Sequence, residues 1–402
     1  MSAENRLLLL LSLANGVVAI DRLAVNFLSP WIVADLGLSN TELGLLASAL
    51  SLAVAASGFL VAALADATGR RRQVLIVAIT LFSLLSALSG VAQGFLALLL
   101  ARFVLGVAEG PVVPVGQAMM AAASTPSRRG LNMGVMQNGG AFVLGGMIGP
   151  VVMVALAESW GWRIAFFVSA APGLLLALAL ARYVVRDATP HETAHRSERS
   201  NLFAALMTRN MILSIGIAGL FTGWLIVQNT FLPLYLTSMR GMTPREMSYV
   251  LSMVGIAGAV GGLVLPALSD RLGRRPILAM AGFAAMVAPL ATLHVGGGAG
   301  MMALVILIGW LVIGCAPLYC AIVPAEATPP AHAAAAIAVA LASGEIIGGV
   351  VMPAIAGALA DAHGLTAPFR LCVGLALLCG LLALGLRETA PRLTGANPDT
   401  AR

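Results

Sequence analysis

Charge is scarce in this sequence. Only 10% of its 402 residues are Asp, Glu, Lys or Arg, against about 25% in an ordinary soluble domain. Because so few charges cannot build a water-soluble surface, a soluble globular protein is excluded. Apolar residues, at 59%, take their place, and they form runs of the roughly 18 to 25 residues that cross about 30 Å of hydrocarbon as a helix. The solvent of the folded chain is therefore lipid.

Lysine is absent, so the formal net charge of +6 comes from arginine alone. Most arginines flank apolar runs, where positive charge sets the orientation of membrane helices, and we predict no nucleic-acid partner. Cysteine is also rare. Cys315, Cys320, Cys372 and Cys379 fall inside apolar segments, at spacings that suit neither a zinc pair nor a redox pair. We expect them to be small core residues, with no disulfide framework.

Motifs for hydrolysis and for ATP use are missing too. The chain has no G-x-S-x-G elbow and no phosphate-binding P-loop, which argues against an esterase and against an ATP-driven pump. His191, Glu192 and His195 match the zinc motif H-E-x-x-H, but they follow Pro190 in a polar linker that would build no dry, shaped cavity. We therefore predict no enzyme, no metal site and no cofactor, with a proton gradient as the energy source.

Twelve apolar segments predict an all-α integral membrane protein. The first resembles a secretory signal, yet it continues through Asp21 and Arg22 without a cleavage site before them, so we assign it as a membrane helix. Helix ends are predicted to within several residues. The predicted spans are residues 7–29, 41–65, 73–94, 97–123, 130–157, 162–182, 211–236, 247–267, 276–294, 301–324, 332–360 and 367–386.

An even number of spans places both termini on the same side of the membrane. With that side cytoplasmic, arginine is concentrated inside, as the positive-inside rule requires. The arginines assigned to the inside are Arg70, Arg71, Arg72, Arg128, Arg129, Arg182, Arg186, Arg271, Arg274, Arg275 and Arg387, and those outside are Arg163, Arg240, Arg245 and Arg370. The predicted location is a bacterial inner membrane, with both termini cytoplasmic and the protein a monomer.

The chain consists of two repeated halves. The loop Asp66-Ala-Thr-Gly-Arg-Arg71 recurs as Asp270-Arg-Leu-Gly-Arg-Arg275, and Gly145–Pro150 resembles Gly348–Pro353, at nearly the same interval of about 200 residues. One long hydrophilic connection follows the sixth span. The predicted parts are an N-terminal six-helix bundle at 1–182, a cytoplasmic linker at 183–209, a C-terminal six-helix bundle at 210–388 and a cytoplasmic tail at 389–402. Such halves are typical of transporters, with the pathway between them.

The two D-x-x-G-R-R loops and the six-plus-six layout resemble the major facilitator superfamily over essentially the whole chain. The resemblance implies two six-helix bundles with inverted repeats within each half. Four further stretches resemble the anion:cation symporter family, which includes proton-coupled carriers of sugar acids and aromatic acids. These stretches are Asp21-Arg22, Arg102–Gly110, Gly161-Trp162-Arg163 and Pro172-Gly173. The first two also occur in spinster-type lysolipid transporters.

Five charged residues lie well inside predicted spans: Asp21, Arg22, Arg102, Glu109 and Glu345. A charge at the centre of a membrane helix costs about 2.5 to 3.5 kcal/mol, so such residues persist mainly where they face a cavity or a partner. Arg102 and Glu109 share one helix face, about 10 Å apart along the axis, and Gly106 between them leaves that stripe open for a ligand. Asp21 and Arg102 reach similar depth, which predicts that they pair.

We hypothesise that Asp21 and Glu109 bind protons, because the proton affinity of a carboxylate in a poorly hydrated cavity depends on whether an arginine lies beside it. In this scheme Asp21 exchanges between Arg102 and a proton, and Arg22 binds the substrate carboxylate with a fork of donors. Glu345 has no arginine partner in the C-terminal half. It is a third proton site, a partner of a substrate hydroxyl, or a carboxyl kept protonated by neighbouring helices. A static salt-bridge network is the alternative for the N-terminal charges.

Uncharged polar residues near mid-helix are predicted to bind the polar part of a substrate, together with Arg22 and Arg102. They are Gln137, Asn138, Gln228, Asn229 and Tyr319. For each of them the alternative is a hydrogen bond between helices. The sequence departs from sugar-acid carriers at Gly140, which stands near the place where a glutamine is expected.

Two charge pairs are predicted where cytoplasmic loops join helices, Asp66 with Arg70 and Asp270 with Arg274. They would hold an inner gate shut in the outward-facing state, or serve only as topology charges with a capping aspartate. Small residues in the fifth and eleventh helices permit close packing and rocking of the halves. They include Gly139, Gly140, Gly145, Gly146, Gly149, Gly344, Gly348, Gly349 and Gly357.

Together these patterns predict a secondary active transporter that moves a small organic anion with protons by alternating access. The anion is a monocarboxylate such as a sugar acid or an aromatic acid. Two alternatives stay open, a spinster-like exporter of lysolipids or drugs and a transport-silent membrane sensor. The predicted partners are the anion, protons and the lipid bilayer.

Overall fold

The computed structural model describes residues 2–125, 128–184, 206–329 and 332–394. In these residues the regular structure is helical, without strands, and twelve helical segments are long and apolar enough to cross a membrane. The prediction of an all-α membrane protein with twelve spans is therefore confirmed. The spans are Ala3–Phe27, Asn40–Thr68, Arg71–Gly90, Phe95–Ala123, Arg129–Trp160, Trp162–Tyr183, Arg209–Ser238, Pro244–Leu272, Arg274–His294, Ala299–Glu326, Ala333–His363 and Ala367–Leu384.

In the described residues the first six spans and the connection between the first two form ten helical elements. These are α1 (Ala3–Phe27), α2 (Ser29–Leu36), α3 (Asn40–Thr68), α4 (Arg71–Gly90), α5 (Phe95–Glu109), α6 (Val112–Ala123), α7 (Arg129–Gly134), η1 (Val135–Ile148), α8 (Gly149–Trp160) and α9 (Trp162–Tyr183). The short helix α2 between the first two spans was not predicted. Its Ser29-Pro30 start and the left-handed backbone of Gly37 (φ 63°) at its end confine it to eight residues.

The last six spans are divided in a similar way. They contain α11 (Arg209–Ser238), α12 (Pro244–Leu272), α13 (Arg274–Ala284), α14 (Val287–His294), α15 (Ala299–Gly309), η3 (Leu311–Cys315), η4 (Leu318–Ile322), α16 (Val323–Glu326), α17 (Ala333–Ser343), η6 (Gly344–Val351), α18 (Met352–His363) and α19 (Ala367–Leu384), followed by α20 (Pro391–Thr394). The linker predicted at 183–209 lies mostly outside the described residues, and the predicted domain boundaries stay a prediction.

The repeat seen in the sequence extends to local structure. The second and eighth spans both begin with a capping box, Ser39 with Glu42 at α3 and Thr243 with Glu246 at α12. The glycine-rich stretches of the fifth and eleventh spans both adopt a π-helical winding, η1 and η6. Corresponding segments therefore start and bend in the same way in the two halves.

Packing follows the same plan in each half. In the first half α1 packs against η1, α4 against α9, and α3 against α5. In the second half α11 packs against η6, α13 against α19, and α12 against η3. The cysteines belong to this packing, as predicted: Cys315, Cys372 and Cys379 are buried, Cys320 is half-buried, and none forms a disulfide.

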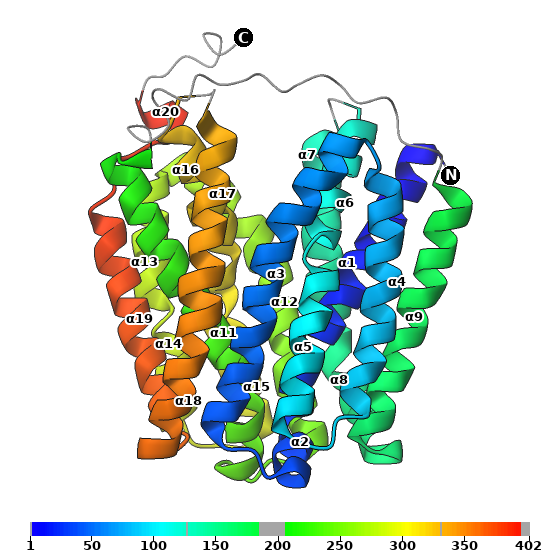
Figure 1. Cartoon of the computed structure of the whole chain (residues 1–402). Helices are drawn as coiled ribbons and strands as arrows, with labels where there is room; N and C mark the ends of the chain where they lie inside the picture. The colour runs from blue at the N-terminus through cyan, green and yellow to red at the C-terminus, as the bar shows by residue number, and fades with distance from the viewer. Residues whose placement is uncertain (1, 126–127, 185–205, 330–331, 395–402) are drawn as a thin grey trace.

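The two halves meet along two seams, α3 against η6 and α18, and α12 against η1 and α8. We call the end of the bundle that carries the start of α1, α7, α16 and α20 the termini end, and the end that carries α2 the opposite end (Figure 1). Figure 1 shows α3 beside α18 at the opposite end and leaning away from α17 toward the termini end. The halves are therefore closed together at the opposite end.

Candidate functional site

The most deeply buried charges form a pair between the first and fourth spans. Asp21 on α1 and Arg102 on α5 are each 1% exposed, and Nη1 of Arg102 lies 3.5 Å from Oδ2 of Asp21. Arg102 also donates through Nη2 to the backbone carbonyls of Asp21 and Arg22, at 3.2 Å each. Ser86 and Ser169 donate hydroxyl hydrogen bonds to Oδ1 of Asp21. The sequence predicts that Asp21 and Arg102 pair because they lie at similar depth in the membrane, and the structure confirms this pair.

A second group centres on Arg22. Its Nη2 donates to both carboxylate oxygens of Glu345, at 3.2 and 3.1 Å, and its Nη1 lies 3.7 Å from Oε1 of Glu109. Glu109 is buried, whereas the side chains of Arg22 and Glu345 are 31% and 28% exposed. Glu345 therefore has an arginine partner after all. The partner lies in the other half of the molecule, where the sequence gives no hint of it.

A cavity of about 390 Å³ lies between the halves and receives the exposed parts of Arg22 and Glu345. The polar side chains that line it are Arg22, Asn26, Ser51, Arg102, Gln137, Thr222, Asn229 and Glu345. The remaining lining is mostly apolar, with Leu23, Phe142, Leu225 and Ile313 among it. This is the composition of a small-molecule site, in which a few polar groups fix orientation within apolar walls.

The sequence predicts an open stripe for a ligand beside Gly106. This prediction was wrong, because another helix fills the space. A side chain at Gly106 would overlap Ala53 and the carbonyl oxygen of Leu50, both on α3. Ser57, also on α3, donates to the Gly106 carbonyl at 3.2 Å. The glycine serves close helix packing, and the space for a ligand lies instead toward the second half.

The predicted polar ligands divide into two groups. Gln137 and Asn229 line the cavity, and Gln137 also accepts a hydrogen bond from Gln117. Asn138, Gln228 and Tyr319 are absent from the lining. Gln228 is fully buried within α11, and Tyr319 stacks on Phe221 with ring centroids 5.3 Å apart. Because side chains on adjacent helical positions diverge by about 100°, only one of two consecutive polar residues reaches the cavity.

Sequence reasoning missed three cavity residues, Asn26, Ser51 and Thr222. Asn26 lies one helical turn after Arg22 on the same face of α1, so helical spacing would have found it. Serine and threonine carry no comparable signal, because they occur throughout the apolar spans as packing residues. Only the docking of α3 and α11 across the cavity identifies Ser51 and Thr222.

The charge pair predicted for the first half is corrected by the structure. Asp66 bonds to Nε of Arg71 at 2.6 Å, not to Arg70. Gly69 between them has φ 64°, and this left-handed turn directs Arg70 into a groove formed by α3, α4 and α5. Asp66 and Arg71 both belong to the first half.

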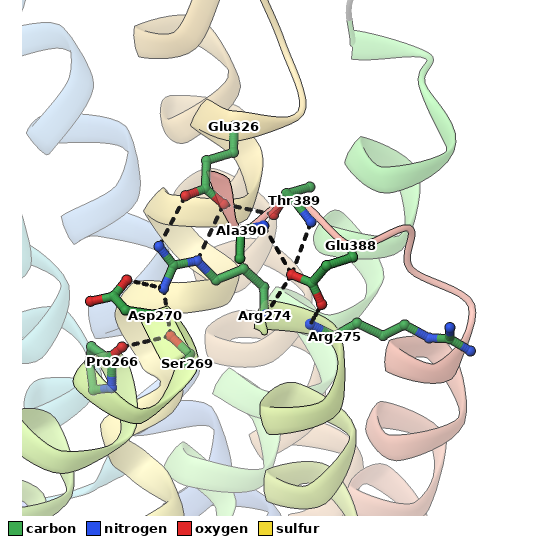
Figure 2. A network of polar contacts seen from close by, with 9 residues as sticks. All are labelled: Pro266, Ser269, Asp270, Arg274, Arg275, Glu326, Glu388, Thr389 and Ala390. Carbon is green, nitrogen blue, oxygen red and sulfur yellow. Dashed lines mark hydrogen bonds and ion pairs between the residues drawn. The ribbon is translucent and has the colours of Figure 1, made fainter. Parts of the chain in front are cut away.

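The pair predicted for the second half is present and belongs to a larger network (Figure 2). Nη1 of Arg274 lies 2.6 Å from Oδ1 of Asp270, and Nη2 lies 3.1 Å from Oε1 of Glu326. Glu388, which follows α19, accepts hydrogen bonds from the backbone N–H of Arg274 and Arg275. Asp270, Arg274, Glu326 and Glu388 all lie within the second half at the termini end.

A contact across the halves at the opposite end was not predicted. Asp361 on α18 accepts four hydrogen bonds from the start of α3. Two come from the backbone N–H of Asn40 and Thr41, at 2.9 and 2.8 Å, and two from their side chains. A carboxylate at a helix start satisfies free N–H groups and complements the helix dipole. No sequence pattern signals such a contact, because its partners lie in different halves.

A second contact at the opposite end stays within the first half. Arg163 and Trp162, at the start of α9, donate to Oδ2 of Asp35 on α2. The hydrogen bond from Arg163 is the main reason why the pKa of Asp35 lies below its ordinary value. Gly161-Trp162-Arg163 thus fixes the short helix α2.

The described residues contain no group of three or more His, Cys, Asp or Glu that could hold a metal ion. His191, Glu192 and His195, which match the zinc motif, lie outside the described residues.

The sequence resembles a known family and two named relatives. The family model described as Major Facilitator Superfamily matches residues 11–341. A Cupriavidus pinatubonensis protein named "Probable 4-methylmuconolactone transporter" is 32% identical over 64% of this chain and 61% of its own length. The hexuronate transporter of Bacillus subtilis is 28% identical over 67% of this chain and 66% of its own length. The chain thus matches less than two thirds of the length of either relative.

Among solved structures, a mutant form of the nucleoside transporter NupG superimposes with a TM-score of 0.80. The match covers 95% of this chain and 99% of that one, at 14% sequence identity. At such low identity the likeness shows that the fold is shared, and it carries no information on the substrate.

Proposed function

Because this chain belongs to the Major Facilitator Superfamily, we propose that it transports a small organic anion together with protons by alternating access. The anion is a monocarboxylate such as a sugar acid or an aromatic acid. The relatives named as a hexuronate transporter and as a probable 4-methylmuconolactone transporter support this class. The protein works as a monomer in a bacterial inner membrane, with its termini end in the cytoplasm.

The observation that carries this proposal is the position of Arg22. Its guanidinium reaches the cavity between the halves, where Gln137 and Asn229 supply neutral hydrogen-bonding groups. A guanidinium presents parallel N–H donors that match the two oxygens of a carboxylate. An organic acid with hydroxyl or carbonyl groups at its other end would satisfy both kinds of partner.

Protons are carried by Asp21 and Glu109. Each is a buried carboxyl beside an arginine, and an oxygen of each lacks a hydrogen bond among the described residues, Oδ2 of Asp21 and Oε2 of Glu109. A buried carboxylate oxygen without a hydrogen bond raises the free energy of the folded protein. Binding of a proton removes the negative charge and so lowers this cost. Movement of Arg102 or Arg22 away from these carboxyls would then favour proton uptake.

Transport in proteoliposomes tests the proposal. We expect a proton gradient to drive accumulation of a hexuronate such as glucuronate, or of benzoate as an aromatic monocarboxylate. Asp21→Asn and Glu109→Gln should abolish accumulation and leave exchange of internal for external anion intact, whereas Arg22→Gln should abolish both. The matched control is Glu158→Gln, which removes a carboxyl group that does not line the cavity.

Two results would contradict the proposal. Unchanged proton-driven accumulation in both carboxyl variants would remove Asp21 and Glu109 as proton sites. Flux of a lysolipid without flux of any tested carboxylate would replace the organic-anion assignment with a lipid exporter.

A further inference from the structure

One of the side chains that line the cavity is itself a carboxylate. Glu345 lines the cavity, and its two carboxylate oxygens occupy Nη2 of Arg22 at 3.2 and 3.1 Å. These are the donors that a substrate carboxylate would need. We propose that Glu345 is a tethered competitor that holds the substrate's place on Arg22 and leaves it when Glu345 binds a proton. This rests on the function proposed above.

The charges around Arg22 explain why a competitor must leave. Glu109 and Glu345 both lie beside the single guanidinium of Arg22, while Asp21 and Arg102 neutralise one another. With every group ionised, the Arg22 group therefore carries one net negative charge. An incoming carboxylate would meet repulsion and an occupied donor. One proton on Glu345 removes the repulsion and vacates Nη2 in the same step, because the neutral acid no longer forms an ion pair.

Exposure determines which of the two carboxyls acts as the competitor. Glu345 is 28% exposed and lines the cavity, so water and an incoming ligand can reach it there. Glu109 is 2% exposed and absent from the cavity lining, and its contact with Arg22 is through Nη1, at 3.7 Å. A substrate carboxylate that approaches through the cavity therefore reaches the Glu345 side of Arg22.

The surroundings of Glu345 contain few other groups that titrate. The helices packed against η6 are α3, α11, α17 and α18. The polar residues that α3 and α11 contribute to the cavity include Ser51 and Thr222, whose hydroxyl groups do not ionise at ordinary pH. Charged groups near Glu345 are Arg22 on α1 and Glu109 on α5, and the thiol of Cys320 on η4 is within its electrostatic reach.

The competitor has a second consequence, because Arg22 and Glu345 belong to different halves. When no substrate is bound, the ion pair leaves Arg22 satisfied, so the empty carrier can reorient without an unpaired buried charge. Removal of the Glu345 carboxylate should therefore slow return of the empty carrier and leave exchange intact. Net accumulation and exchange then respond differently to the same substitution.

The test is the affinity of the full-length, solubilised protein for glucuronate and for benzoate, each counted as the ionised anion, at about pH 4.5 and about pH 8. In the unmodified protein affinity should fall as pH rises. In Glu345→Gln the affinity should be roughly tenfold higher than in the unmodified protein at the upper pH, and the difference should narrow at the lower pH. Glu158→Gln should match the unmodified protein, and net uptake by Glu345→Gln should fall while counterflow persists.

An unchanged or lower affinity of Glu345→Gln at the upper pH refutes the inference. If Glu345 were only a structural bridge, Glu345→Gln would bind the two anions equally well or more weakly at the upper pH. Glu345→Asp keeps the charge but shortens the side chain, so it should retain pH dependence with weaker competition, and it serves as the test if Glu345→Gln fails to fold. A failure of the proposed function would look different. The unmodified protein would then bind neither anion, or Arg22→Gln would bind both anions as well as the unmodified protein does.

Discussion

The two ends of the bundle use their polar side chains differently. At the opposite end, hydrogen bonds cross from one half to the other, from Asn40 and Thr41 to Asp361. At the termini end, the ion pairs remain within a half, Asp66 with Arg71 in the first and Arg274 with its partners in the second. Contacts that cross the halves must break when the molecule opens at that end. Contacts within a half can persist through the whole cycle.

The opposite end is also symmetric between the two seams. Ser48 on α3 donates to the Val350 carbonyl at 2.7 Å, and Ser252 on α12 donates to the Met147 carbonyl at 2.8 Å. These pairs occupy corresponding positions of the repeat. The symmetry breaks at Asp361, whose counterpart Glu158 forms no ion pair within 4 Å among the described residues and interacts with Arg245 on α12 only at longer range. The α3–α18 seam therefore carries a hydrogen-bonded latch, whereas the other seam has a weaker electrostatic contact at the corresponding place.

The largest effect is expected from bulk placed in the α3–α18 seam. A side chain at Gly44 would overlap the carbonyl oxygen of Pro353 on α18, so Gly44→Trp should keep the opposite end from closing. Transport should fall by roughly 100-fold, because the alternating access that we propose for this chain requires closure of each end in turn. Uptake in proteoliposomes measures the loss.

A tryptophan at Gly94 is the matched control, because nothing lies within 4 Å of the added Cβ there. Gly94→Trp should transport normally, and distances between spin labels at Ala34 and His363 should increase in Gly44→Trp alone. Normal transport by Gly44→Trp would show that the closed seam is not needed.

A smaller effect is expected from removal of the latch. Asp361→Ala removes four hydrogen bonds from the start of α3, but all are exposed, so the loss should be about 1 kcal/mol, or roughly fivefold in the closed population. The distance distribution between the same labels reports that shift. Glu158→Ala in the other seam removes only a longer-range interaction with Arg245, so it should shift the distribution less than Asp361→Ala does. An equal shift in both variants would remove the distinction between the seams.

Contacts along one helix or at one depth could be predicted from the sequence. Hydropathy placed all twelve spans, and equal depth placed Asp21 beside Arg102, as the structure has them. The local sequence suffices there, because the bilayer fixes how far along its axis each residue lies. The pair Asp270 and Arg274, four residues apart on adjoining helix ends, follows from the same short range.

Contacts that depend on how the halves dock could not be predicted. Nothing in the sequence relates Arg22 to Glu345, or Asp361 to Asn40, since more than three hundred residues separate each pair. The choice of Arg71 over Arg70 by Asp66 depends on the left-handed turn at Gly69, which the sequence motif does not resolve. Prediction thus failed where side-chain direction, rather than depth, decides the partner.

The smallest effect concerns the termini end, where contacts within one half should influence stability and leave the conformational equilibrium unchanged. Glu388 accepts backbone N–H bonds from Ala390, Arg274, Arg275 and Thr389. Partial burial alone would raise the pKa of Glu388, but these bonds together bring it below its ordinary value. The charged form therefore stabilises the fold above about pH 4.5, the ordinary pKa range of a glutamate.

That contribution is lost as pH falls through the lowered pKa, because the folded state must then take up the proton. Glu388→Gln should have a lower melting temperature than the unmodified protein at about pH 7, by a few degrees at most, and the difference should narrow as pH falls below about 4.5. Thermal unfolding of both proteins across this range measures it. The Ala34–His363 label distances should be identical in the two proteins, and a shift in them would mean that the network in Figure 2 senses which end is open.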